Sequence, residues 1–255
     1  MASKKWIFFI CFGLILVLTA CATGDLALKK ERSKASRDLG EAYMGQNAYT
    51  RALREFLKAE QIYAKDPFLQ NDLGLAYMSK KKYDKAISHF KYALELKPDF
   101  SPARNNLGAA YMEKENWDAA IECFKAVKDD LLYATPHFPL TNLGFIAFHR
   151  SNYDQAVSYY KEALDLMPGF PKALHGLGQV YMETGKYDKA VKVLEKAVDK
   201  APEEARIHLE LGKAYRNIHE YNKAYETFKK AAAMGKDTQW GEEAARLAEE
   251  VWRFE

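Results

Sequence analysis

The amino-acid sequence predicts an all-α protein, a right-handed superhelical solenoid of six helix-turn-helix repeats that ends in a capping helix. The first observation is a Leu-Gly pair that recurs at spacings of 34, 34, 36, 34 and 34 residues, a period typical of stacked helical hairpins. The second is a set of small and aromatic residues that keeps its register within each period. The third is a proline that ends several second helices. The pairs are Leu39-Gly40, Leu73-Gly74, Leu107-Gly108, Leu143-Gly144, Leu177-Gly178 and Leu211-Gly212.

The amino terminus has the features of a secretory signal, which we expect over residues 1–20. Lys4 and Lys5 precede an uncharged run from residue 6 to residue 20. Such a run makes about 22 Å of helix, which is short for a bilayer core of about 30 Å. Basic residues followed by a short apolar run indicate a signal peptide. An uncleaved membrane anchor is the alternative interpretation.

The apolar run ends in Leu18-Thr19-Ala20-Cys21, which resembles a bacterial lipobox. The resemblance implies cleavage before Cys21 and lipidation of its thiol, and each buried methylene of an acyl chain adds about 0.8 kcal/mol of membrane affinity. Ala22 follows the cysteine instead of an aspartate, which favours the periplasmic face of the outer membrane. Residues 21–32 contain no pattern long enough to fold, so we expect a tether there.

The repeats are numbered so that each Leu-Gly pair occupies positions 7 and 8. Position 20 is alanine in every repeat, position 11 is tyrosine in all but one, and position 24 is an aromatic residue or leucine. Small residues at 8 and 20 allow the two helices to approach closely, and the larger ones fill the space between helices. The expected repeats are 33–66, 67–100, 101–136, 137–170, 171–204 and 205–236. A capping helix is expected over 237–255, with Trp240, Ala244, Leu247, Val251 and Trp252 facing inward.

The register also predicts a surface for a protein partner. Positions 2, 5, 9, 12 and 13 of each first helix should line the concave face of the solenoid, and methionine, phenylalanine and asparagine recur among them in the first five repeats. Methionine-rich surfaces adapt to varied peptides. The alternative is that position 12 is partly buried between neighbouring helices. The candidate partner-binding residues are Phe68, Asn71, Leu75, Met78, Asn105, Ala109, Met112, Phe138, Phe145, Phe148 and Met182.

Composition and motifs favour no other class of function. The formal charge of +3 is close to neutral, and no basic stripe with interleaved aromatics suggests nucleic-acid binding. Gly178 and Lys186 lack the spacing of a phosphate loop. His149 and His175 share no helical metal motif, so polar lining is the simpler interpretation. We therefore expect no catalytic residues, no metal site, no cofactor and no small-molecule substrate.

The repeat columns closely resemble the tetratricopeptide repeat over residues 33–236. One junction is two residues longer than the others, and it contains Asp130, Leu132, Tyr133, Thr135 and Pro136. Together with the lipobox and six repeats, this segment is similar to the type IV pilus biogenesis lipoproteins of the PilF/PilW kind. Those lipoproteins are pilotins, which help a secretin pore to localise and multimerise.

This resemblance implies a non-enzymatic outer-membrane adaptor that binds a secretin segment in its concave groove, with membrane attachment through a lipid anchor. The alternative is a general cell-envelope scaffold that recruits cell-wall hydrolases or joins an export or polysaccharide-secretion complex. Both would use the same fold, lipid and groove. A phenotype in pili would favour the first function, and a phenotype in cell shape would favour the second.

Overall fold

The computed structural model describes residues 25–130 and 132–252, and every regular element in these ranges is an α-helix. The all-α class and the helix-turn-helix repeat fold predicted from the sequence are therefore confirmed. The expected signal peptide, the lipidation site Cys21 and Leu131 of the longer junction lie outside the described residues. The helices are an unlabelled first helix (residues 25–45), α2 (Tyr49–Ile62), α3 (Pro67–Ser79), α4 (Tyr83–Leu96), α5 (Ser101–Glu113), α6 (Trp117–Lys128), α7 (His137–His149), α8 (Tyr153–Leu166), α9 (Pro171–Glu183), α10 (Tyr187–Lys200), α11 (Ala205–Asn217), α12 (Tyr221–Met234) and α13 (Gln239–Trp252).

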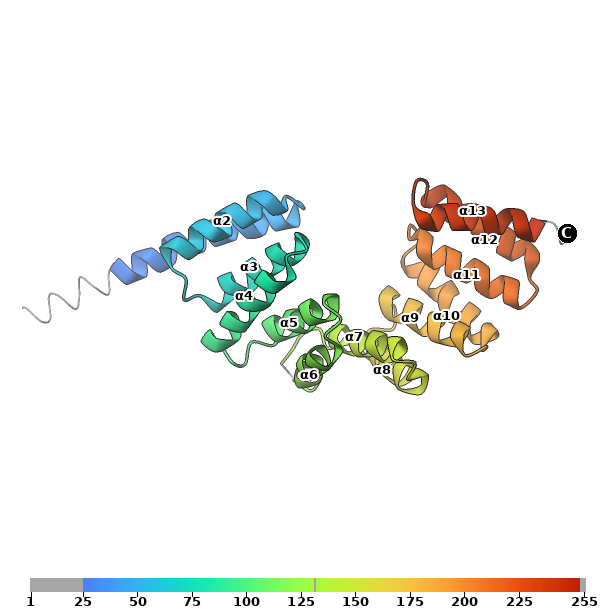
Figure 1. Ribbon diagram of the computed structural model, residues 1–255, viewed down its shortest axis with the longest axis horizontal. Coiled ribbons are helices and arrows are strands. Elements are labelled where there is room, and N and C mark those ends of the chain that lie inside the picture. Colours follow the sequence, from blue (N-terminus) through green and yellow to red (C-terminus); the bar gives the residue numbers. More distant parts are fainter. Residues whose placement is uncertain (1–24, 131, 253–255) are drawn as a thin grey trace, which may run out of the picture. The chain divides into compact units, whose positions relative to one another are not determined.

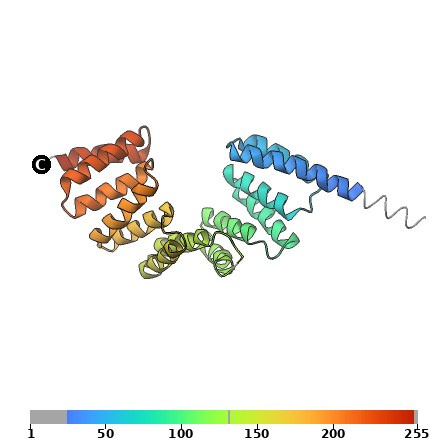
Figure 2. The same cartoon turned by 180° about the vertical axis from the view of Figure 1, so that it is seen from behind.

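The chain divides into two compact units, residues 1–116 and 117–255. In the described part of the first unit, α2 packs on α3, α3 on α4 and α4 on α5. In the second unit, α6 packs on α7, and neighbouring helices continue to pack on each other through to α13. Figures 1 and 2 show the paired helices of each unit from opposite sides.

The turn between the two helices of each repeat has one conformation throughout. Position 15 has a positive φ in every repeat, and only one of the six residues is glycine. A single left-handed residue after a helix reverses the chain and satisfies the last carbonyl groups of the helix. The six residues are Asn47, Lys81, Glu115, Ser151, Gly185 and His219.

The Leu-Gly column has a steric cause that the structure makes specific. A Cβ atom built on Gly144 would lie 2.8 Å from the Tyr160 ring, and one on Gly178 would lie 2.6 Å from Leu194 Cγ. Residues 160 and 194 occupy position 24 of their repeats. The glycine at position 8 therefore makes room for the large side chain at position 24, which is buried in every repeat.

Two expectations differ from the structure. Residues 25–32 were expected to belong to a tether, but they extend the first helix by two turns beyond Ser33. This segment is rich in Leu, Ala, Lys, Glu and Arg, which favour helix, and Lys29 forms an ion pair with Asp25 one turn away. In α13, Ala244, Leu247 and Val251 are buried as expected, but Trp252 is 57% exposed, with its ring centroid 5.1 Å from that of Tyr225 on α12. Within the described residues, no helix is long and apolar enough to span a membrane.

Candidate protein-binding surface

In the first unit, polar side chains connect the first helices of successive repeats. Asn106 Nδ2 donates a 2.9 Å hydrogen bond to Asn71 Oδ1, and Asn71 Nδ2 lies 3.4 Å from Asp72 Oδ1. Asp72 Oδ2 lies 3.8 Å from Arg37 Nε. Position 5 of one repeat thus meets position 6 of the next, which joins residue 37 to 72 and residue 71 to 106. This row of amides and charges lies along the face where a peptide backbone could form hydrogen bonds.

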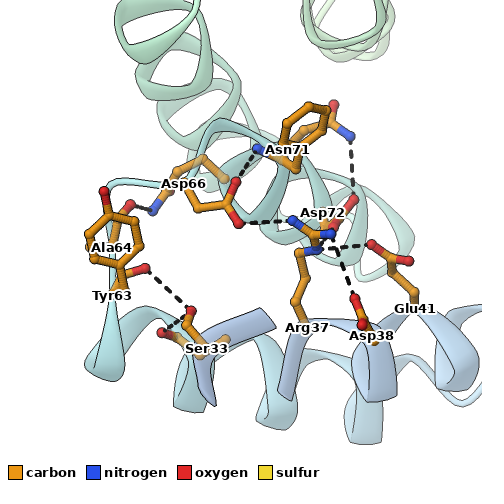
Figure 3. Close-up of polar contacts among 12 residues, drawn as sticks. Ser33, Arg37, Asp38, Glu41, Tyr63, Ala64, Asp66, Asn71 and Asp72 are labelled. Atoms are coloured by element: carbon orange, nitrogen blue, oxygen red, sulfur yellow. Dashed lines mark hydrogen bonds and ion pairs between the residues drawn. The ribbon is translucent and has the colours of Figure 1, made fainter. Parts of the chain in front are cut away.

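Arg37 is the centre of the polar cluster in Figure 3. Its guanidinium contacts Asp66 at 2.8 Å, Glu41 at 3.1 Å and Asp38 at 3.6 Å, and its side chain is only 15% exposed. One arginine faces four carboxylates here, counting Asp72. Burial, followed by the nearby Glu41 charge, raises the pKa of Asp72 to about 7, because both effects disfavour the ionised carboxylate.

Phe68 is the exposed apolar side chain beside this cluster. Asp66 caps α3 by accepting a hydrogen bond from the Phe68 amide at 2.9 Å, which fixes the first turn that carries the ring. The ring is 46% exposed and packs edge-on against Phe100, with centroids 5.0 Å apart. The guanidinium of Arg37 and the ammonium of Lys97 lie 5.6 and 5.3 Å from its centroid. An accessible ring held between fixed neighbours is a suitable anchor for a partner.

In the second unit, an aromatic strip follows α7. Phe138 and Phe145 are two turns apart on the same face and are 38% and 36% exposed. Phe138 packs edge-on against Phe170, and Phe145 lies 4.2 Å from the His149 ring. His149 in turn stacks on Trp117 at 5.9 Å. These side chains form an apolar surface that is stiff, because each ring is supported by another.

The structure places the predicted partner-binding residues at different depths. Phe68, Phe138 and Phe145 are the three with exposed rings. Asn71 is 8% exposed and is engaged by Asn106. The half-buried members are Leu75, Met78, Asn105, Ala109, Met112, Phe148 and Met182. Phe148 and Met182 pack against the core of the second unit.

Several surface residues were not identified from the sequence as partner-binding residues. Arg37 occupies position 5 of the first repeat, the same position as Asn71 and Asn105, and this shared position was the available signal. Trp117 begins a second helix, where the other repeats have tyrosine, so only the structure reveals that it supports the strip on α7. His149 was interpreted only as polar lining.

Three buried polar atoms on these first helices have no hydrogen-bond partner in the described part of the chain. They are Asp72 Oδ2, Asn105 Oδ1 and His175 Nε2. Burial, together with the Arg206 charge, lowers the pKa of His175 to about 4, so the imidazole is neutral near neutral pH.

The fold and surface define a class of protein: a helical repeat scaffold that presents aromatic and amide side chains on its first helices. The tetratricopeptide repeat family model matches residues 77–131, 147–208 and 185–247. These ranges cover more than half of the chain, so the protein belongs to the tetratricopeptide repeat family. Members of such repeat families act as scaffolds that bind protein partners over extended surfaces.

Solved structures share this fold. PilW, described as a widely conserved type IV pilus biogenesis factor, has a TM-score of 0.75 and 24% identity, over 84% of this chain and 98% of PilW. PilF of Pseudomonas aeruginosa has a TM-score of 0.74 and 17% identity, over 86% and 99% of the two chains. MamA has a TM-score of 0.55 and 27% identity, over 68% and 97%. No curated protein matches the chain.

Proposed function

We propose that this protein is a non-enzymatic adaptor that binds an extended or helical segment of a partner protein along its first helices. The exposed, cation-flanked ring of Phe68 is the observation that carries this proposal. An exposed aromatic side chain fixed by a capped helix loses little conformational entropy when a partner covers it. The half-buried amide of Asn106, in the neighbouring row, supplies hydrogen-bonding groups for a peptide backbone.

We further propose that the adaptor is a lipid-anchored pilotin of the outer membrane, which promotes localisation and multimerisation of a secretin in type IV pilus biogenesis. The lipobox ending at Cys21 and the two-residue insertion between repeats 3 and 4 support this proposal. The similarity in fold to PilW and PilF along almost their entire chains is consistent with it.

Site-specific photo-crosslinking in intact cells tests the binding surface. A photoreactive amino acid at Phe68 or Phe145 should trap one partner, whereas the same group at Leu166, which is 55% exposed on α8, should not. Mass spectrometry then identifies the trapped protein. A secretin subunit supports the pilotin function, and a cell-wall hydrolase or export component supports the envelope scaffold instead. Equal trapping from all three positions would contradict a specific surface.

The anchor is tested separately with Cys21→Ser in the full chain. We expect this variant to be released from the membrane fraction and the secretin to be misplaced. Intact-mass analysis of the wild-type protein should show the added acyl chains. Unchanged secretin placement in the variant would overturn the pilotin mechanism, although the binding surface could still hold a different partner.

A further inference from the structure

The first helix exposes a face that every later repeat buries. Positions 3, 7 and 10 of repeat 3 are Ala103, Leu107 and Ala110, which are 0%, 6% and 0% exposed. The first repeat has the same three residue types at these positions, but all three are exposed, and its leucine is 44% exposed. Leu28 lies two helical turns before Ala35 on the same side of the first helix and is 52% exposed. The uncovered stripe is Leu28, Ala35, Leu39 and Ala42.

The buried triad shows what kind of occupant this stripe fits. Ala103 packs in one cluster with Ala93 of the preceding repeat, and α5 lies against both α3 and α4. Alanine at positions 3 and 10 lets a neighbouring helix approach closely, and leucine at position 7 fills the space between them. The equivalent stripe of the first helix therefore fits another α-helix.

We propose that the occupant is the first helix of a second copy of this chain, paired in parallel about a two-fold axis. Leu28, Ala35 and Ala42 recur every seven residues, the spacing at which a helix meets an identical partner along a continuous seam. A two-fold interface must be self-complementary, since the same patch serves both copies.

The flanking charges are self-complementary in the parallel arrangement only. Glu31 borders one side of the stripe, and Arg32 lies on the other side at the heptad position of Leu39; both are exposed and form no ion pair within the described residues. In a parallel pair, each Arg32 lies beside the partner's Glu31 at the same height. In an antiparallel pair, Glu31 would instead approach the partner's Asp38, which borders the same side, and like charges would meet. A parallel pair also places both amino ends together.

Disulfide trapping in the full-length protein in cell envelopes tests the pairing and its direction. Ala35→Cys, Leu28→Cys and Ala42→Cys should each give a covalent homodimer, because a parallel pair brings every identical position on the stripe together. Ala233→Cys, which is exposed on α12, and the wild type should stay monomeric. Trapping at residue 35 without trapping at 28 and 42 would overturn the parallel arrangement. Trapping of a different protein would overturn the second copy as occupant.

Charge exchange provides an independent test. In the Ala35→Cys background, Glu31→Arg or Arg32→Glu alone should reduce dimer yield several-fold, and the double exchange should restore it. Leu39→Asp should abolish trapping, whereas Leu166→Asp, at another exposed leucine, should not. Failure of the double exchange to restore the dimer would overturn the proposed pairing. The measured dimer yield involves neither a secretin nor another partner, so the test of the pairing is independent of the proposed function.

Discussion

Replacing Asp72 with asparagine should stabilise the protein at neutral and alkaline pH. The carboxyl group has a pKa of about 7 in the folded chain, against 3.8 for the unperturbed side chain. A carboxyl whose pKa is raised by folding contributes stability that is present below about pH 4 and is lost as the pH rises through 7. The difference is about 3 pKa units, and at 1.36 kcal/mol per unit it corresponds to about 4 kcal/mol.

The geometry explains why asparagine should be tolerated. Asp72 is 15% exposed, and its Oδ2 atom accepts no hydrogen bond from the described residues. An asparagine at this position keeps an oxygen for the Asn71 amide and removes the repulsion from Glu41. Arg37 loses one ionic contact but retains Asp66 at 2.8 Å and Glu41 at 3.1 Å. The free energy gained by removing a buried charge should therefore exceed the free energy lost with the long contact to Arg37.

Urea unfolding followed by circular dichroism at pH 4 and pH 8 measures this effect. The stability of Asp72→Asn relative to wild type should be near zero at pH 4 and rise by a few kcal/mol at pH 8. The difference between the two proteins cancels the titration of groups that do not interact with Asp72. Asp99→Asn, at an exposed aspartate of the same unit, should show no such rise. A wild type at least as stable as Asp72→Asn at pH 8 would refute the reasoning.

Three further predictions concern packing, backbone and acid stability. Gly144→Ala should lower stability by about 1–3 kcal/mol in denaturant titrations, because its Cβ would overlap the Tyr160 ring, whereas Gly45→Ala, with nothing within 4 Å, should be neutral or slightly stabilising. Gly185→Ala should cost about 1 kcal/mol, since Gly185 has a φ of +68°, and an unchanged unfolding midpoint would contradict this. Folding lowers the pKa of His175 to about 4. The neutral imidazole therefore contributes to the stability of the fold above about pH 6.5, and this contribution is lost as the pH falls through 4. His175→Gln should therefore flatten the fall in stability between these pH values, as thermal melts across the range would show.

The fold could be predicted from the sequence because each repeat imposes the same local requirement. Gly144 and Gly178 must lack a side chain because position 24 fills their space, and this rule is visible as a periodic pattern. The Arg37 cluster is different, because no later repeat has an arginine at position 5 or an acidic residue at position 9, the positions of Arg37 and Glu41. Only the packing of the first helix on α3 brings the carboxylates of the cluster together. The raised pKa of Asp72 therefore has no counterpart in the repeat pattern.

The same argument explains why exposure could not be predicted from position alone. Leu39 and Leu107 occupy the same column and have the same residue types at positions 3, 8 and 10 of their repeats, yet one is 44% exposed and the other 6%. The difference arises from the presence of a preceding helical pair, which the column does not encode. Trp252 of α13 is likewise exposed, although the sequence pattern places it on the inward face of that helix. Apolar side chains at the ends of a repeat array therefore carry information that interior repeats do not: they indicate where a further protein surface can pack.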